Sequence, residues 1–318
     1  MLPFLFLLAQ SSLPPEVALA PATLLTETKE ASQPKEELTR PLLVTVPPYL
    51  FLIGELVGDG LPVELVLPAG ASPHTYEPTA RQVDRLSRGR IWFTLGEPFE
   101  ERAFRAMQAF SPDLERFDLR QGVDLIEDSH CHSHAGQAHS CADLHYWLSP
   151  KELNRQLSLL VPFLISHYPS LRSRIEQNGQ RLQLELKQLD EQLASLLSQT
   201  DHPSRLMLVA HPAFGYFARD YGLEQLSIEQ EGKEPSVRQL TQLLERAKAA
   251  STHKVFVLPQ YPKKAAELIA SQLGAELVQV DPYAKDYFGM MRQLGKELAQ
   301  TPPTGKPQAP PLLPKASP

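Results

Sequence analysis

The sequence predicts an α/β fold with two similar lobes, each a mainly parallel sheet flanked by helices, bridged by one long helix. Short apolar runs alternate with amphipathic helical patterns along most of the chain, which is typical of parallel strands covered by helices on both faces. The helical pattern over residues 170–199 is much longer than the others and divides the alternation into two halves.

The elements of the first half are bounded by proline and glycine residues. The run L-L-V-T-V stops at Pro47-Pro48, and the next apolar run stops before Gly70. Boundaries of this kind predict strands at residues 42–46, 63–67, 91–95 and 116–119. They predict helices at residues 49–57, 79–88, 98–109 and 149–167, the last of which begins at the capping pair Ser149-Pro150.

The long helix and the second half follow the same rules. Apolar residues recur every three, four or seven positions over residues 170–199, with Gly179 as the weak point of a helix about 45 Å long. Beyond it we expect strands at residues 206–210, 223–228, 254–258 and 276–280. The expected helices cover residues 214–221, 236–250, 263–273 and 286–300.

Changes in composition predict the limits of the domains. The apolar run at residues 2–9 followed by small and polar residues indicates an N-terminal signal segment, so we expect export from the cytoplasm. The expected units are a signal segment at 1–12, a disordered linker at 13–40, a lobe at 41–169 with a His-rich loop at 128–142, a connecting helix at 170–200, a lobe at 201–300 and a Pro-rich tail at 301–318.

Composition excludes some classes of function. The chain has 318 residues, 42% of them hydrophobic, which is enough for two domains with sizeable cores. Its formal net charge of −6 argues against nucleic acid as the main partner. The chain has no G-x-x-x-x-G-K-[ST] loop, so we do not expect it to hydrolyse ATP by that route.

Residues 128–150 hold five of the ten histidines and both cysteines. Imidazole and thiol ligands suit Zn, Cu(I) or Ni better than Mg or Ca. An oxidising compartment would let Cys131 and Cys141 form a disulfide, whereas in a reducing one they would be additional ligands. We interpret four histidines as an accessory metal-collecting loop: His130, His132, His134 and His139.

Four further candidate ligands lie where expected strands end. Ligands of open α/β sheets bind beyond the carboxyl ends of the strands. A single histidine there is more often a cap or a core residue, but two candidates come from each half, which favours one metal in the cleft between the lobes. Three imidazoles and one carboxylate suit a four-coordinate zinc. These candidates are His74, His145, His211 and Asp281, and Glu77 is a candidate hydrogen-bond partner of His74.

Five ordered motifs carry a family resemblance over residues 41–300. They are G-A-S-P-H-T-Y-E-P at 70–78, D-L-H-Y-W-L-S-P at 143–150, A-H-P-A-F-G-Y-F at 210–217, S-I-E-Q-E-G-K-E-P-S at 227–236 and V-D-P at 280–282. With them the chain resembles the metal-specific solute-binding proteins of ABC importers, the ZnuA-like or TroA-like zinc and manganese receptors. A His-rich loop before the second ligand is typical of the zinc members.

The resemblance implies a function and a ligand set. His74, His145, His211 and Asp281 would be the metal ligands, and His211 favours zinc because manganese members usually have a carboxylate at that position. The chain would be a periplasmic or otherwise extracytoplasmic receptor, not an enzyme, and we expect a monomer. It would deliver Zn²⁺ to a membrane permease that is powered by a separate ATPase.

The sequence leaves two alternatives to a zinc receptor open. One is a manganese or mixed divalent-metal receptor of the same family. The other is a zinc-dependent hydrolase in which Asp281 acts as general base, although the chain contains no H-E-x-x-H motif.

Overall fold

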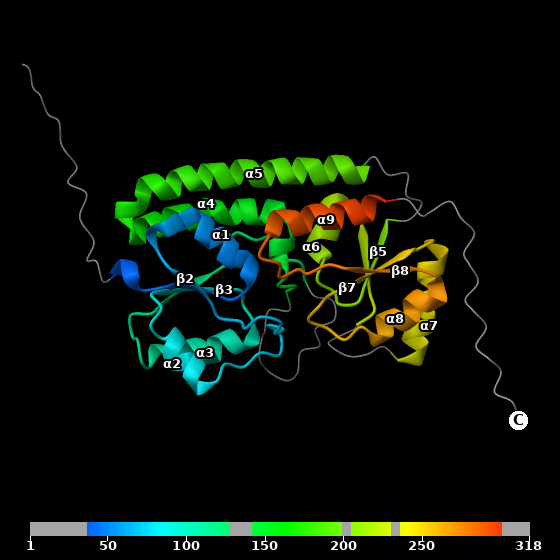
Figure 1. The fold of residues 1–318 in the computed structure, drawn as a ribbon, viewed down its shortest axis with the longest axis horizontal. Helices are drawn as coiled ribbons and strands as arrows, with labels where there is room; N and C mark the ends of the chain where they lie inside the picture. Colours follow the sequence, from blue (N-terminus) through cyan, green and yellow to red (C-terminus); the bar gives the residue numbers. More distant parts are fainter. Residues whose placement is uncertain (1–36, 128–141, 199–204, 230–235, 301–318) are drawn as a thin grey trace, which may run out of the picture. The chain divides into compact units, whose positions relative to one another are not determined.

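The computed structural model describes residues 37–127, 142–198, 205–229 and 236–300. In these residues the chain forms two four-stranded sheets in which all paired strands are parallel, as the sequence predicts (Figure 1). The first sheet has the order β2-β1-β3-β4, and its strands are β1 (Leu42–Val44), β2 (Val63–Leu65), β3 (Ile91–Thr94) and β4 (Glu115–Asp118). The second has the order β6-β5-β7-β8, with β5 (Leu206–Val209), β6 (Glu224–Ser227), β7 (Lys254–Val257) and β8 (Glu276–Gln279).

Helices connect the strands, as parallel pairing requires. They are α1 (Pro47–Val57), α2 (Ala80–Leu86), α3 (Pro98–Gln108), α4 (Pro150–His167), α5 (Arg172–Ser198), α6 (Gly215–Tyr221), α7 (Val237–Ala249), α8 (Lys264–Leu273) and α9 (Tyr287–Ala299). Short 3₁₀ turns are η1 (Glu37–Thr39), η2 (Gly58–Gly60), η3 (Tyr146–Leu148) and η4 (Pro169–Leu171). The predicted strands and helices are all present, and their ends differ by two residues or fewer.

Each sheet is covered by helices on both faces because alternate strand residues point to opposite sides. Leu43 and Trp92 pack with buried residues of α2 and α3, whereas their neighbours Leu42 and Phe93 belong to a larger core. In the second sheet, Val255 packs against α7 and α8. The larger core is continuous and includes residues of both sheets and of α1, α4, α5 and α9.

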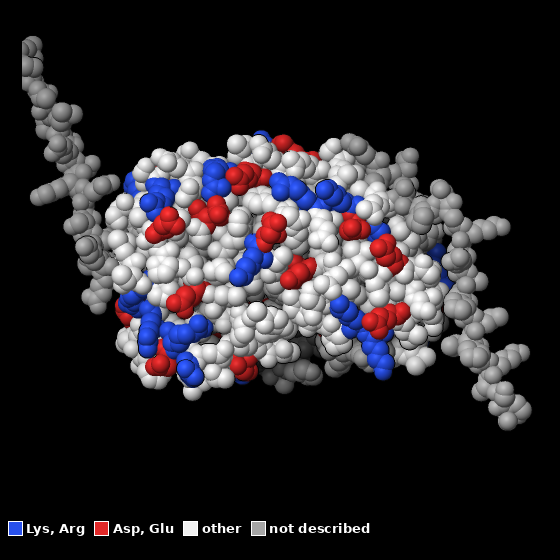
Figure 2. Space-filling model, viewed as in Figure 1, with Lys and Arg blue, Asp and Glu red and all other residues white. Residues whose placement is uncertain are grey.

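The long helix α5 lies against α1, α4 and α9 (Figure 1). Its buried residues keep helical spacing along one stripe: Ile175, Gly179, Leu182, Leu186, Leu189, Leu193 and Leu197. The opposite face carries ion pairs four residues apart, such as Arg172–Glu176 and Arg181–Glu185. Side chains of both charge signs are interspersed over the face of the molecule drawn in Figure 2.

The folded chain begins a few residues earlier than predicted. The last residues of the expected linker form η1, and Arg40 donates to the carboxylate of Asp113 and to the carbonyl oxygen of Gly89, which fixes this segment to the first lobe. The signal segment at 1–12, most of the linker at 13–40 and the tail at 301–318 lie outside the described residues. Within the described part of the chain, no helix is both long and apolar enough to cross a membrane.

Candidate metal centre

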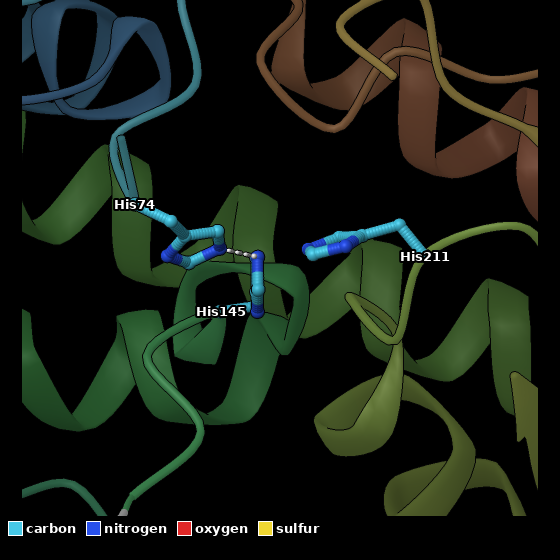
Figure 3. A group of neighbouring side chains, drawn as sticks. All are labelled: His74, His145 and His211. Carbon is cyan, nitrogen blue, oxygen red and sulfur yellow. Dashed lines mark hydrogen bonds between the residues drawn. The ribbon is translucent and has the colours of Figure 1, made fainter. Parts of the chain in front are cut away.

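Three of the predicted ligands, His74, His145 and His211, lie together. Their imidazole rings point toward one another in Figure 3. His74 lies in the loop after β2, His145 in the segment between β4 and η3, and His211 directly after β5. The cluster therefore forms at the carboxyl ends of strands from both sheets, as the strand-end rule predicts.

The spacing of the three imidazoles suits one metal ion. One ligand atom from each residue lies within 4.8 Å of those of the other two. Nε2 of His74 and Nε2 of His145 are 3.3 Å apart. Tetrahedral zinc with Zn–N bonds of about 2.0–2.1 Å holds two nitrogens about 3.3–3.4 Å apart, which agrees with this distance. His145 and His211 are buried, whereas the His74 side chain is 33% exposed, which leaves the cluster accessible to solvent on the His74 side.

A carboxylate lies at the Nδ1 atom of each imidazole. Glu97 Oε2 is 3.2 Å from Nδ1 of His74, Asp143 Oδ1 is 2.8 Å from that of His145, and Glu229 Oε2 is 2.9 Å from that of His211. In a neutral imidazole, a proton on Nδ1 leaves Nε2 as the lone-pair donor to a metal. The three Nε2 atoms thus form the face of the cluster that is open to a cation.

The environment of His211 favours the neutral, metal-binding form. Burial, helped by the nearby His145 and His74, lowers the pKa of His211 to about 4, although the Glu229 hydrogen bond acts in the opposite direction. Its Nε2 atom is buried and has no hydrogen-bond partner in the described chain. A buried, unpaired nitrogen is costly, and coordination of a metal would satisfy it.

His74 has the opposite shift. Burial alone would lower the pKa of His74, but the hydrogen bond with Glu97 and the negative charges of Glu97, Asp143 and Glu229 outweigh burial and raise it. The carboxylates around this accessible histidine therefore favour a positive charge at His74.

A second buried carboxylate, that of Glu100, fixes the loop that carries Glu97. The side chain of Glu100 accepts hydrogen bonds from the backbone N–H groups of Leu95, Gly96 and Glu97 and from the hydroxyl of Thr45. Burial raises the pKa of Glu100 to about 7 despite these donors. Because the turn between β3 and α3 is held in this way, Glu97 faces His74 in a defined position.

An aromatic ring completes the surroundings of His211. The ring of Tyr261, which lies between β7 and α8, stacks on the imidazole of His211 with ring centroids 3.9 Å apart and an interplanar angle of 15°. The Tyr261 hydroxyl lies 3.3 Å from Oγ of Ser72, two residues before His74. Tyr261 thus connects the segments that carry two of the clustered histidines.

The fourth predicted ligand, Asp281, is not part of the three-histidine cluster. It follows β8 as predicted, but its Oδ1 atom accepts hydrogen bonds from Nε2 of Gln260 at 2.7 Å and from the backbone N–H of Tyr283 at 3.0 Å. Its neighbour Pro282 accepts a hydrogen bond from Nε1 of Trp147 at 3.0 Å, which ties this segment to η3. Coordination by Asp281 stays a prediction.

The predicted hydrogen bond between Glu77 and His74 is wrong. Glu77 is exposed and pairs with Arg102, and Glu97 is the residue that contacts His74. Glu97 is distant in sequence and gave no local signal, although it follows a strand as the ligands do. Asp143 and Glu229 lie inside two of the five sequence motifs. The D-x-H spacing could have predicted the contact of Asp143 with His145, and the position after a strand could have predicted Glu229 at the site. The accessory histidines and cysteines, His130, Cys131, His132, His134, His139 and Cys141, lie outside the described residues.

Two parallel sheets, one long helix and a cluster of three carboxylate-bound histidines define a metal-binding protein of the two-lobed α/β class. The match to a known family is consistent with this class and extends over residues 42–301. The chain belongs to that family, described as zinc-uptake complex component A, periplasmic, and abbreviated ZnuA.

Individual relatives agree with the family. A zinc-bound deletion mutant of ZnuA has a crystal structure that is 31% identical in sequence, with a TM-score of 0.74, covering 82% of this chain and 97% of that one. A protein of Chlamydia muridarum (strain MoPn / Nigg), whose name refers to metal binding, is 31% identical over 78% of this chain and 86% of its own length. The high-affinity zinc uptake system protein ZnuA of Bacillus subtilis (strain 168) is 26% identical over 78% of this chain and 80% of its own length.

Proposed function

We propose that this protein is an extracytoplasmic receptor that binds Zn²⁺ and delivers it to the membrane permease of an ABC importer with a separate ATPase subunit. His74, His145 and His211 would hold the ion. The observation that carries the proposal is that three imidazoles converge and that a carboxylate oxygen lies next to the Nδ1 atom of each. Zinc is the cargo of such a protein, and no chemical step is required of the site.

The ligand types favour zinc over manganese. Nitrogen ligands suit zinc, whereas carboxylate and carbonyl oxygens suit manganese. The three residues that converge here are all histidines. The fourth position would be taken by Asp281 after its side chain turns away from Gln260, or by a water molecule. A zinc-bound relative of 31% identity supports the same preference.

The long helix limits how the protein would release its cargo. Because α5 packs along α1, α4 and α9, a large hinge rotation would expose apolar surface that is now buried. Release would instead follow small shifts that separate His211 from His74 and His145 and spoil the tetrahedral geometry.

The His-rich loop would act as a weak collector of zinc. His130, His132, His134 and His139 would raise the local zinc concentration near the fixed site, as expected for a tethered second binding element. In an oxidising compartment, Cys131 and Cys141 would form a disulfide that closes this loop. Deleting residues 129–140 should leave one tight zinc per chain and reduce the total stoichiometry, and loss of the tight zinc on this deletion would refute this division of roles.

Zinc binding and transport are tested with the same variant. Competitive titration should give one tight zinc per wild-type chain and a more than about hundredfold weaker site in His145→Ala, because a lost ligand costs more than a lost outer partner. In cells that lack the protein, the wild type should restore growth under zinc limitation and His145→Ala should not. His167→Ala, which changes a histidine paired with Glu115 outside the cluster, is the matched control.

Two results would contradict the proposal. One is the absence of tight zinc binding by the wild type, and the other is full restoration of growth by His145→Ala. Turnover of an ester or peptide by the zinc-loaded protein would favour the hydrolase instead, and we expect none.

A further inference from the structure

We propose that Tyr216 is a positioning residue of the metal site, which holds Asp143, the carboxylate that orients His145, at a fixed distance from His211. This inference rests on the proposed function and adds a residue outside the set of candidate ligands. Tyr216 belongs to α6 in the second half of the chain, whereas Asp143 and His145 belong to the first.

The hydroxyl of Tyr216 joins two separate backbone segments of the first half. It donates a hydrogen bond to the carbonyl oxygen of Asp143 at 2.7 Å and accepts one from the backbone N–H of Ile126 at 3.1 Å. These segments also pair with each other, because the N–H of Asp143 donates to the carbonyl oxygen of Ile126 at 2.9 Å. Tyr216 is fully buried, so a hydroxyl deprived of these partners would find no bulk water to replace them.

Asp143 in turn positions the candidate metal ligand His145. Its Oδ1 atom accepts hydrogen bonds from the backbone N–H of His145 at 2.9 Å and from Nδ1 of the same residue at 2.8 Å. The carboxylate therefore sets both the backbone and the ring of His145. A displacement of Asp143 would tilt the His145 ring away from the other two imidazoles.

The same helix is connected to His211 by a short segment. Only Pro212, Ala213 and Phe214 separate His211 from α6, and the N–H of Phe214 donates to Oε1 of Gln225 at 2.6 Å. Next to Tyr216, a Cβ atom on Gly215 would lie 2.7 Å from Oδ2 of Asp143. The absence of a side chain at Gly215 thus allows α6 to approach this carboxylate closely. The helix α6 therefore contacts the carboxylate that holds His145 and also follows His211 closely in the chain.

A second anchor holds α6 in place independently of the Tyr216 hydroxyl. Arg219 donates to Oε1 of Glu152 at 2.6 Å and to the carbonyl oxygen of Asp124 at 2.8 Å, and its guanidinium lies over the Tyr216 ring. Removing the Tyr216 hydroxyl should therefore leave the helix docked. The effect of such a change should concentrate on Asp143 and the metal site.

The test uses Tyr216→Phe in the full chain, with Tyr221→Phe as the matched control. Tyr221 lies on the same helix and its hydroxyl contacts Asp190 of α5, away from the cluster. Both variants lose one hydroxyl and should lower the melting temperature of the metal-free protein. Only Tyr216→Phe should weaken zinc binding, by about three- to tenfold, and change the visible absorption spectrum of the 1:1 Co²⁺ complex.

A double mutant distinguishes an effect of Tyr216 that acts through Asp143 from a general loss of packing. In an Asp143→Ala background, Tyr216→Phe should weaken zinc binding by less than about twofold, because the carboxylate through which Tyr216 acts on His145 is gone. An additive effect would overturn the proposal, as would a Tyr216→Phe variant with wild-type zinc affinity and Co²⁺ spectrum. If the wild type lacks tight zinc binding, the proposed function fails and the role of Tyr216 fails with it.

Discussion

Oε2 of Glu229 lies 2.9 Å from Nδ1 of His211, and the Nε2 atom of the same imidazole is buried without a hydrogen-bond partner among the described residues. The carboxylate favours the tautomer that carries its proton on Nδ1, so that the lone pair of Nε2 is directed at the cluster. The same relationship recurs at His74 with Glu97 and at His145 with Asp143. Three carboxylates thus prepare three imidazoles for a cation.

The first prediction concerns this outer carboxylate. Glu229→Ala should weaken zinc binding by about ten- to a hundredfold, because the His211 ring loses its orienting partner and its basicity falls. Glu224→Ala is the control. Glu224 is the first residue of β6, the strand that precedes Glu229, and it pairs with Arg246 at the surface. Equal zinc affinities of the two variants in a competitive titration would contradict this role of Glu229.

The second prediction concerns the choice of metal. His211→Glu replaces a nitrogen ligand with oxygen and should shift the ratio of zinc to manganese affinity toward manganese. Competitive titration of wild type and variant with both metals measures this ratio. An unchanged ratio would mean that selectivity does not depend on the ligand type at this position.

The third prediction concerns pH and the buried carboxyl group of Glu100. Its pKa is about 7 in the folded chain against an ordinary value of 4.5. Between these values the folded protein keeps a proton that the unfolded chain has lost, so the free energy of unfolding falls as pH rises through this window. The contribution is on the order of 3 kcal/mol.

Comparison with Glu100→Gln isolates this group from other titrating residues. Relative to the variant, the metal-free wild type should lose stability from pH 4.5 to 7 in urea unfolding experiments. Glu101→Gln is the control on the same helix, because arginine partners lower the pKa of the exposed Glu101. If the free energies of unfolding of the wild type and of Glu100→Gln differ by the same amount throughout this range, Glu100 titrates normally.

The fourth prediction concerns the packing of α5 on α4. A Cβ atom on Gly179 would lie 2.7 Å from Cγ2 of Val161, a stiff β-branched side chain. Alanine normally gains about 1 kcal/mol over glycine inside a helix, but overpacking costs about 1–3 kcal/mol. Gly179→Ala should therefore lower the free energy of unfolding, and adding Val161→Ala should recover part of the loss. Stabilisation by Gly179→Ala alone would contradict the close packing of the two helices.

The sequence predicts the fold because local signals and packing agree. Apolar runs such as that at residues 42–46 end at proline or glycine, so their limits are marked in the chain itself. The three clustered histidines could be predicted because parallel strands place their carboxyl ends at one edge of a sheet. The Glu97–His74 pair could not, because it depends on the turn between β3 and α3 that Glu100 holds. The hydrogen bond between Asp281 and Gln260 is a side-chain contact that no spacing rule describes.

The tight zinc should be held by the three histidines His74, His145 and His211. X-ray absorption at the zinc edge of the 1:1 complex measures the ligands directly, because Zn–N and Zn–S bonds differ by about 0.2–0.3 Å. We expect a first shell of nitrogen and oxygen with three imidazoles and no sulfur. A shell that contains sulfur at about 2.3 Å would instead place the tight site on Cys131 and Cys141 and contradict this account.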